Sequence, residues 1–198
     1  ASMYFRSSPA SPAGTVRFEV PAPENTTLVD MQIGLSPDGR LIAFGATGGG
    51  EARPRLWVRP LDSVQARPLA GTEGASGGFF WLPDNQTLVF ASGGKLRKIN
   101  VAGGPAQAIC DFSFDVGGGF LTPDNRPVFA TPSTDGIRAC PAGGGAATSI
   151  TAFKADGQEG YHAFPFLLPD GNHFLFIRAV GNAAGVYIGA LDAKPEEQ

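Results

Sequence analysis

The chain has 198 residues, of which 42% are hydrophobic and 17% charged, and its formal net charge is −3. This length is enough to bury roughly 70% of the unfolded chain's surface, and the charge is too small for the basic footprint of a nucleic-acid-binding protein. No apolar run approaches the ~18 residues of a membrane-spanning helix, while 28 glycines, 17 prolines and 15 phenylalanines favour turn-rich β-sheets.

The N-terminal segment, residues 1–15, is rich in Ser, Pro and Ala. This composition predicts a disordered linker. The next five residues, Val16-Arg17-Phe18-Glu19-Val20, alternate apolar and polar side chains, which is the pattern of a strand with one buried face. The strand stands apart from the repeats that follow it.

Four copies of one short phrase divide the rest of the chain. Their prolines are 46, 40 and 46 residues apart, and an apolar run follows each phrase. A period of ~40–45 residues built of short strands is typical of a β-propeller with one blade per repeat. The phrases are Ser36-Pro37-Asp38-Gly39, Leu82-Pro83-Asp84-Asn85, Thr122-Pro123-Asp124-Asn125 and Leu168-Pro169-Asp170-Gly171.

Each phrase has the chemistry of a tight turn between two strands. Proline sets φ at the second position, aspartate accepts hydrogen bonds from the backbone ahead of it, and glycine or asparagine tolerates positive φ. We therefore expect a structural role for Pro37, Asp38, Gly39, Pro83, Asp84, Asn85, Pro123, Asp124, Asn125, Pro169, Asp170 and Gly171.

The repeats predict an all-β propeller of four-stranded antiparallel blades at residues 28–70, 71–111, 112–152 and 153–198. The second strands are nearly unbroken apolar runs, as expected where both faces are covered. The third strands carry basic residues, for which we expect a solvated edge: Arg55, Arg59, Lys95, Arg97, Lys98 and Arg138.

The fourth repeat stops at Gln198, where its own fourth strand would begin. Two interpretations remain. Either the strand at residues 16–20 completes this blade and closes a four-bladed ring, or the chain is part of a larger propeller. We favour the larger propeller, in which the open blade edge would invite self-association.

The two cysteines, Cys110 and Cys140, fall in the fourth strand of one expected blade and the third strand of the next. A disulfide between neighbouring blades is one reading. We favour two buried thiols that act as small apolar residues.

The loops between blades and those between second and third strands converge on one face of a propeller, where ligands commonly bind. We expect the partner to be a protein or a small molecule, and no nucleic acid. The candidate ligand-binding residues on this face are Glu51, Arg53, Glu73, Asp115, Asp135, Tyr161 and His162.

No catalytic constellation is evident. The sequence around Ser76 matches G-x-S-x-G, but that chemistry needs a strand, a sharp turn and a helix around the serine, and a glycine-rich loop is expected here. The two histidines, His162 and His173, are expected at opposite ends of one blade. We therefore predict no catalytic residue, no metal, no cofactor and no enzyme activity in this chain.

The repeats resemble the TolB-like, WD-repeat-like propellers. Three stretches resemble more closely the extracytoplasmic propeller of bacterial membrane-anchored serine/threonine protein kinases: Leu56-Trp57-Val58-Arg59-Pro60-Leu61-Asp62-Ser63, Gly103-Gly104-Pro105 and the eleven residues from Phe166 to Phe176. This resemblance implies a kinase domain and a single membrane span upstream, an extracytoplasmic location and a non-catalytic binding or sensor function. The alternatives are the propeller of a prolyl-oligopeptidase-like hydrolase and a TolB-like component of an envelope assembly.

Overall fold

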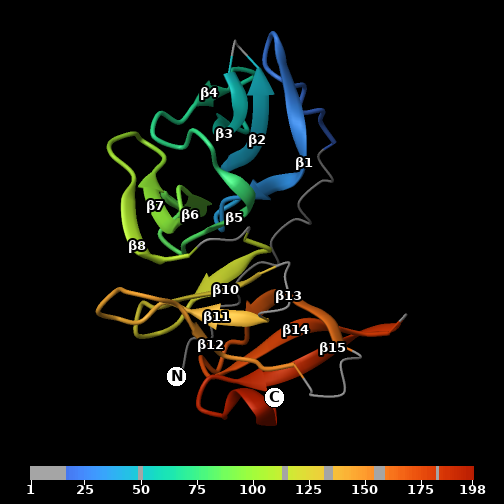
Figure 1. Ribbon diagram of the computed structural model, residues 1–198. Coiled ribbons are helices and arrows are strands. Elements are labelled where there is room, and N and C mark those ends of the chain that lie inside the picture. The colour runs from blue at the N-terminus through green and yellow to red at the C-terminus, as the bar shows by residue number, and fades with distance from the viewer. Residues whose placement is uncertain (1–16, 49–50, 113–115, 132–135, 154–158, 182) are drawn as a thin grey trace, which may run out of the picture.

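The computed structural model describes residues 17–48, 51–112, 116–131, 136–153, 159–181 and 183–198. Within these ranges the chain forms four antiparallel sheets and one short 3-10 helix (Figure 1). The first strand of each sheet contacts the first strand of the next sheet along the chain. The sheets are therefore arranged as the consecutive blades of a propeller. The predicted fold class, an all-β propeller with four blades present, is confirmed.

Counted over the described residues, blades 1 to 3 have four strands each and blade 4 has three. Blade 1 contains β1 (Thr26–Leu35), β2 (Leu41–Gly48), β3 (Glu51–Pro60) and β4 (Arg67–Pro68). Blade 2 contains β5 (Ser76–Trp81), β6 (Thr87–Ser92), β7 (Lys95–Asn100) and β8 (Gln107–Asp111). Blade 3 contains β9 (Gly119–Leu121), β10 (Pro127–Ala130), β11 (Ile137–Ala139) and β12 (Thr148–Ser149). Blade 4 contains β13 (Glu159–Leu167), β14 (His173–Val180) and β15 (Ala183–Ala190), and η1 (Pro195–Glu197) follows it.

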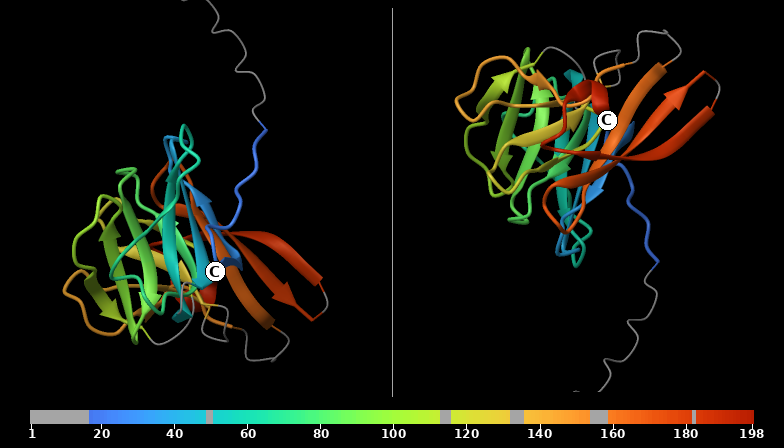
Figure 2. Two further views of the ribbon diagram at one scale, coloured as in Figure 1. Left: turned by 90° about the horizontal axis from the view of Figure 1, so that it is seen from above. Right: turned by 90° about the horizontal axis from the view of Figure 1, so that it is seen from below.

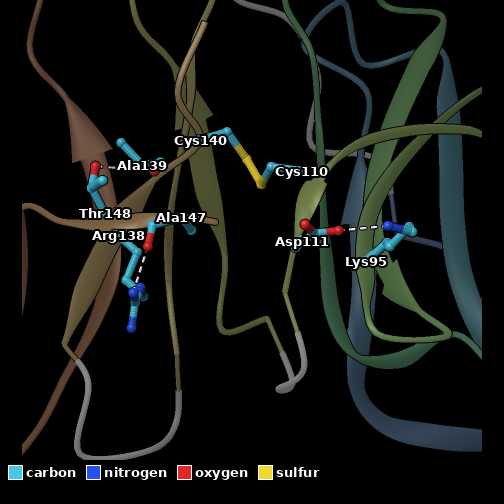
Figure 3. Close-up of a disulfide and its surroundings, with 8 residues drawn as sticks. All are labelled: Lys95, Cys110, Asp111, Arg138, Ala139, Cys140, Ala147 and Thr148. Carbon is cyan, nitrogen blue, oxygen red and sulfur yellow. Dashed lines mark hydrogen bonds and ion pairs between the residues drawn. A yellow bond between two sulfur atoms is a disulfide. The ribbon is translucent and has the colours of Figure 1, made fainter. Parts of the chain in front are cut away.

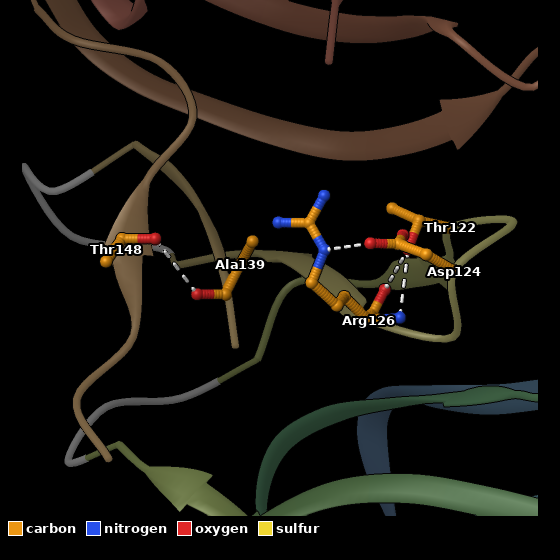
Figure 4. A network of polar contacts seen from close by, with 5 residues as sticks. All are labelled: Thr122, Asp124, Arg126, Ala139 and Thr148. Carbon is orange, nitrogen blue, oxygen red and sulfur yellow. Dashed lines mark hydrogen bonds and ion pairs between the residues drawn. The ribbon is translucent and has the colours of Figure 1, made fainter. Parts of the chain in front are cut away.

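A turn joins the first and second strands of every blade, at the four repeated phrases. The expectation of positive φ at the fourth position is met at Gly39 (69°), Asn85 (62°), Asn125 (63°) and Gly171 (75°). In blade 3, the hydroxyl of Thr122 donates to Asp124 Oδ1 at 2.5 Å, and Arg126 Nε donates to Asp124 Oδ2 at 2.6 Å (Figure 4).

The hydrophobic core lies between adjacent blades. Three clusters of buried side chains join blade 1 to blade 2, blade 2 to blade 3, and blade 3 to blade 4. Phe90 and Phe129, both fully buried on second strands, lie in the first and second of these clusters. Burial of a phenylalanine side chain contributes about 1.5–3 kcal/mol, so contacts between blades, rather than within one sheet, hold the body together.

The interpretation of the two cysteines as free thiols is wrong. A disulfide joins Cys110 at the end of β8 to Cys140 just after β11, with 5.8 Å between the two Cα atoms (Figure 3). Beside it, the amide of Asp111 donates to the carbonyl of Gly145 at 2.8 Å, which also links blade 2 to blade 3. Strand packing brings these residues together across 30 positions of sequence, a proximity that spacing alone does not reveal.

Residues 17–20, the described part of the expected N-terminal strand, do not close blade 4. Residues 17–20 form no strand, and they lie on blade 1, where Arg59 stacks on the Phe18 ring at 5.7 Å and donates to the carbonyl of Glu19 at 3.4 Å. Arg59 is consequently only 5% exposed. The expectation of a solvated edge therefore fails at this residue, because Phe18 and Glu19 cover it.

Candidate loop-face binding site

The structure separates the candidate ligand-binding residues into two groups. Arg53 and Glu73 lie at the junction of blades 1 and 2, whereas Tyr161 and His162 lie on β13 of blade 4. Asp115 and Asp135 fall outside the described residues, and for Glu51 only the backbone position at the start of β3 is described.

An ion pair organises the junction of blades 1 and 2. Arg55 Nη2 lies 3.3 Å from Glu73 Oε1, and the other carboxylate oxygen of Glu73 accepts the amide of Gly71 at 2.9 Å. The side chain of Arg55 is 22% exposed and that of Glu73 is 45% exposed. An ion pair this open to water contributes little stability, so its main effect is to orient the two side chains.

Two further arginines lie beside Gly74 and Ser92, next to the loop that carries Glu73. A Cβ added to Gly74 would lie 3.7 Å from Arg53 Nη1 and 3.9 Å from the hydroxyl of Ser92, so glycine leaves room for both neighbours. Arg97 Nε donates to the carbonyl of Ser92 at 3.1 Å. We call Arg53, Arg55, Glu73, Ser92 and Arg97 the arginine cluster. It combines three guanidinium groups with one carboxylate, so it favours an anionic ligand.

His162 is a core residue. Its ring packs edge-on against Phe153 and Phe176 at centroid distances of 4.6 and 5.2 Å, and its Nδ1 lies 2.7 Å from the Thr151 hydroxyl. Burial lowers the pKa of His162 from 6.5 to about 4, so the imidazole is neutral at pH 7. Tyr161, the preceding residue, is 39% exposed and remains available on the surface.

The other residues considered for catalysis or metal binding, Ser76 and the two histidines, lie in or beside β-strands. Ser76 is the first residue of β5 and pairs with Ala91 on β6, so it lies in a sheet rather than at a strand-to-helix turn. His173 begins β14, and its Nδ1 lies 2.7 Å from Asp170 Oδ2. His162 on β13 pairs with Arg178, near the other end of β14, so the two histidines are far apart along the strand. Among the described residues, no group of three or more His, Cys, Asp or Glu is placed to hold a metal ion, and no helix is long and apolar enough to cross a bilayer.

Sequence reasoning missed an open depression of about 340 Å³ at the turn end of blade 2. Asp84, Lys98, Asn100 and Gln107 contribute its polar lining. Asp84 is already engaged there, because its carboxylate accepts the Gln86 and Thr87 amides at 2.9 and 2.8 Å. No sequence signal marked this hollow, because its lining comes from a turn, a glycine-rich loop and three strands, β6, β7 and β8.

Solved structures with the same fold are numerous, whereas neither a protein-family model nor a curated protein sequence matches the chain. TolB from Acinetobacter baumannii is 19% identical, with a TM-score of 0.61, and the match covers 82% of this chain and 41% of TolB. A luciferin-regenerating enzyme is 10% identical, with a TM-score of 0.62, over 86% of this chain and 63% of the enzyme. The β-propeller domain of the Trilobed protease from Pyrococcus furiosus is 16% identical, with a TM-score of 0.51, over 85% of this chain and 56% of that chain.

These similarities show that the chain has the β-propeller fold, which TolB from Acinetobacter baumannii shares. At identities of 10–19% they carry the fold alone. The chain spans less than two thirds of each of these three proteins. The resemblance to kinase-associated propellers remains a sequence-based prediction.

The expectation that this chain has no enzyme activity is contradicted. Propellers with its fold include the luciferin-regenerating enzyme, an oligogalacturonate lyase in complex with manganese and a gluconolactonase from Xanthomonas campestris. The missing sequence motifs therefore do not exclude catalysis. The shared fold alone does not establish it either.

Proposed function

We propose that this chain is a ligand-recognition propeller whose loop face binds an anionic group at the arginine cluster. The observation that carries this proposal is the Arg55–Glu73 ion pair at the junction of two blades, with Arg53 beside Gly74 and Arg97 bound to the carbonyl of Ser92. Arg53 is exposed, so it can reach a bound ligand, while Arg55 is oriented by Glu73. Guanidinium groups bind carboxylates and phosphates through paired hydrogen bonds.

A fluorescent poly-glutamate peptide tests this proposal through its fluorescence anisotropy at low salt. Arg53→Ala should weaken binding about fivefold to tenfold, a loss of roughly 1–1.4 kcal/mol. Arg40→Ala is the matched control, because Arg40 is an exposed arginine at the turn end of blade 1. Binding that is undetectable, or equally weakened by both substitutions, contradicts the proposal.

We further propose that the chain works outside the cytoplasm. The Cys110–Cys140 disulfide supports this location, since disulfides persist in oxidising compartments. A component of a bacterial envelope assembly, as a TolB-like fold suggests, and the sensor part of a serine/threonine kinase receptor are both consistent with that location. The gene sequence upstream of residue 1 distinguishes them. A kinase domain followed by one membrane span indicates the receptor, and a signal peptide alone indicates the assembly component.

A further inference from the structure

The three contacts between blades share one design. In blades 1, 2 and 3, apolar residues of the second strand and of the third strand face the next blade along the chain. None of these side chains is more than 2% exposed. They are Ala43, Leu56 and Val58 of blade 1, Val89, Ala91 and Leu96 of blade 2, and Val128, Ala130, Ile137 and Ala139 of blade 3.

Blade 4 repeats this face, but it lies open. Leu175 pairs with Ile188 and Ile177 pairs with Val186, in the register that Val128 and Ala130 have with their partners in blade 3. Ile188 is 59% exposed and Val186 is 70% exposed. Phe166, opposite Leu175 on β13, is 66% exposed. Figure 2 shows the β14–β15 hairpin extending away from the other sheets. We call Phe166, Leu175, Ile177, Val186 and Ile188 the forward face.

The opposite side of each blade, which we call its receiving side, packs against the preceding blade in the chain. On this side, the second strand of blade 2 presents Leu88 and Phe90, and the second strand of blade 4 presents Phe174 and Phe176. In blade 1 this register holds Ile42 and Phe44, which pair with Leu35 and Ile33 on β1.

This receiving side of blade 1 is covered over β2, where Ile42 is 5% and Phe44 is 1% exposed, and it is open only over β1. Phe18 and Glu19 lie over Arg59 at one part of it. Ile33 remains 61% exposed, Leu35 53% and Leu28 38%. We call Leu28, Ile33 and Leu35 the receiving face.

We propose that the forward face of one copy of this chain binds the receiving face of a second copy. In blades 1 to 3, the side equivalent to the forward face is covered by the receiving side of the next blade, so the repeat itself specifies the kind of sheet that fits. Blade 1 is the blade whose receiving side has no preceding blade among the described residues. Contiguous exposed apolar side chains of this kind mark interaction surfaces.

This contact joins two different surfaces, so it is directional. Each copy offers one forward face and one receiving face. A pair that uses all four faces forms a closed dimer, and a pair that leaves two faces free adds further copies. Light scattering of the 198-residue chain across a wide concentration range should therefore show a dimer or larger species.

Two substitutions test the two faces separately. Ile188→Lys on the forward face and Ile33→Lys on the receiving face should each weaken self-association at least about tenfold, because each buries a charge in the contact. Val64→Lys is the matched control, since Val64 is 86% exposed in the loop after β3, and it should leave association unchanged. Circular dichroism checks that all variants remain folded.

Mixing the two variants gives the decisive result. The Ile33→Lys chain keeps an intact forward face and the Ile188→Lys chain keeps an intact receiving face, so an equimolar mixture should form a dimer that neither variant forms alone. Three results would overturn the proposal: a wild-type chain that stays monomeric throughout, an Ile33→Lys chain that associates as the wild type does, or a mixture that stays monomeric.

Discussion

Individual residues in the turns act through the backbone. Asn85 and Asn125 occupy left-handed conformations, with φ of 62° and 63°, where the other two blades have glycine. Most side chains are strained there, and glycine and asparagine are the residues that tolerate the conformation. This requirement is local, so the sequence alone was enough to predict it at all four turns.

Substitutions at Asn125 measure the requirement. Asn125→Ala should lower the free energy of unfolding by about 1 kcal/mol, because alanine is strained at positive φ. Asn125→Gly is the matched control and should change the unfolding free energy by only a few tenths of a kcal/mol, because its larger entropy loss offsets its relief of strain. Urea unfolding compares the two. Equal unfolding free energies for the Ala and Gly variants would contradict the backbone explanation.

Asp170 shows how a turn aspartate responds to pH. Hydrogen bonds from the amides of His173 and Asn172, and from the His173 side chain, lower the pKa of Asp170 from 3.8 to about 2. Because the folded-state pKa lies below the unfolded one, the carboxylate stabilises the fold above pH 3.8, and this contribution is lost as the pH falls towards 2.

Asp170→Asn should therefore lower the melting temperature at neutral pH, and the gap from the wild type should narrow as the pH falls through this window. Thermal unfolding at a series of pH values measures the gap. Asp62→Asn, in the exposed turn after β3, is the control. A gap that stays constant down to pH 2 would mean that the Asp170 charge is not responsible.

At the scale of elements, the disulfide locks β8 of blade 2 to the end of β11 in blade 3. A cross-link between residues 30 positions apart restricts the unfolded chain, so its loss should lower the unfolding free energy by on the order of 3–4 kcal/mol. Urea unfolding with and without reductant measures this loss. The double variant Cys110→Ala, Cys140→Ala should not respond to reductant. Two free thiols in the oxidised wild-type protein would contradict the cross-link.

Elements differed in how far they could be predicted from the sequence. The second strands and their turns follow from local patterns, such as the apolar run from Phe174 to Ile177 after Pro169. The position of residues 17–20 does not. An alternating stretch indicates a strand but not its partner, and here the contact of Phe18 with Arg59 keeps the segment on blade 1. The burial of His162 between Phe153 and Phe176 also depends on packing across the fold.

At the scale of the whole molecule, the fold is easier to predict than the site. Four similar repeats specify a propeller, because each blade must cover the apolar face of its neighbour. The arginine cluster draws Arg53 from β3, Glu73 from a loop between blades and Arg97 from β7, so no short motif marks it. For the same reason, missing motifs do not exclude a catalytic site.

Hydrogen exchange of β15 tests the central claim, that this chain is an open array of four blades, most directly. In blades 1 to 3 a fourth strand covers the third, whereas blade 4 ends at β15. We predict fast exchange for the amides on the outer edge of β15 and slow exchange for the matching amides of β7, which pair with β8. Equal protection of both strands, lost from β15 when residues 1–20 are removed, would mean that the N-terminal strand closes the ring.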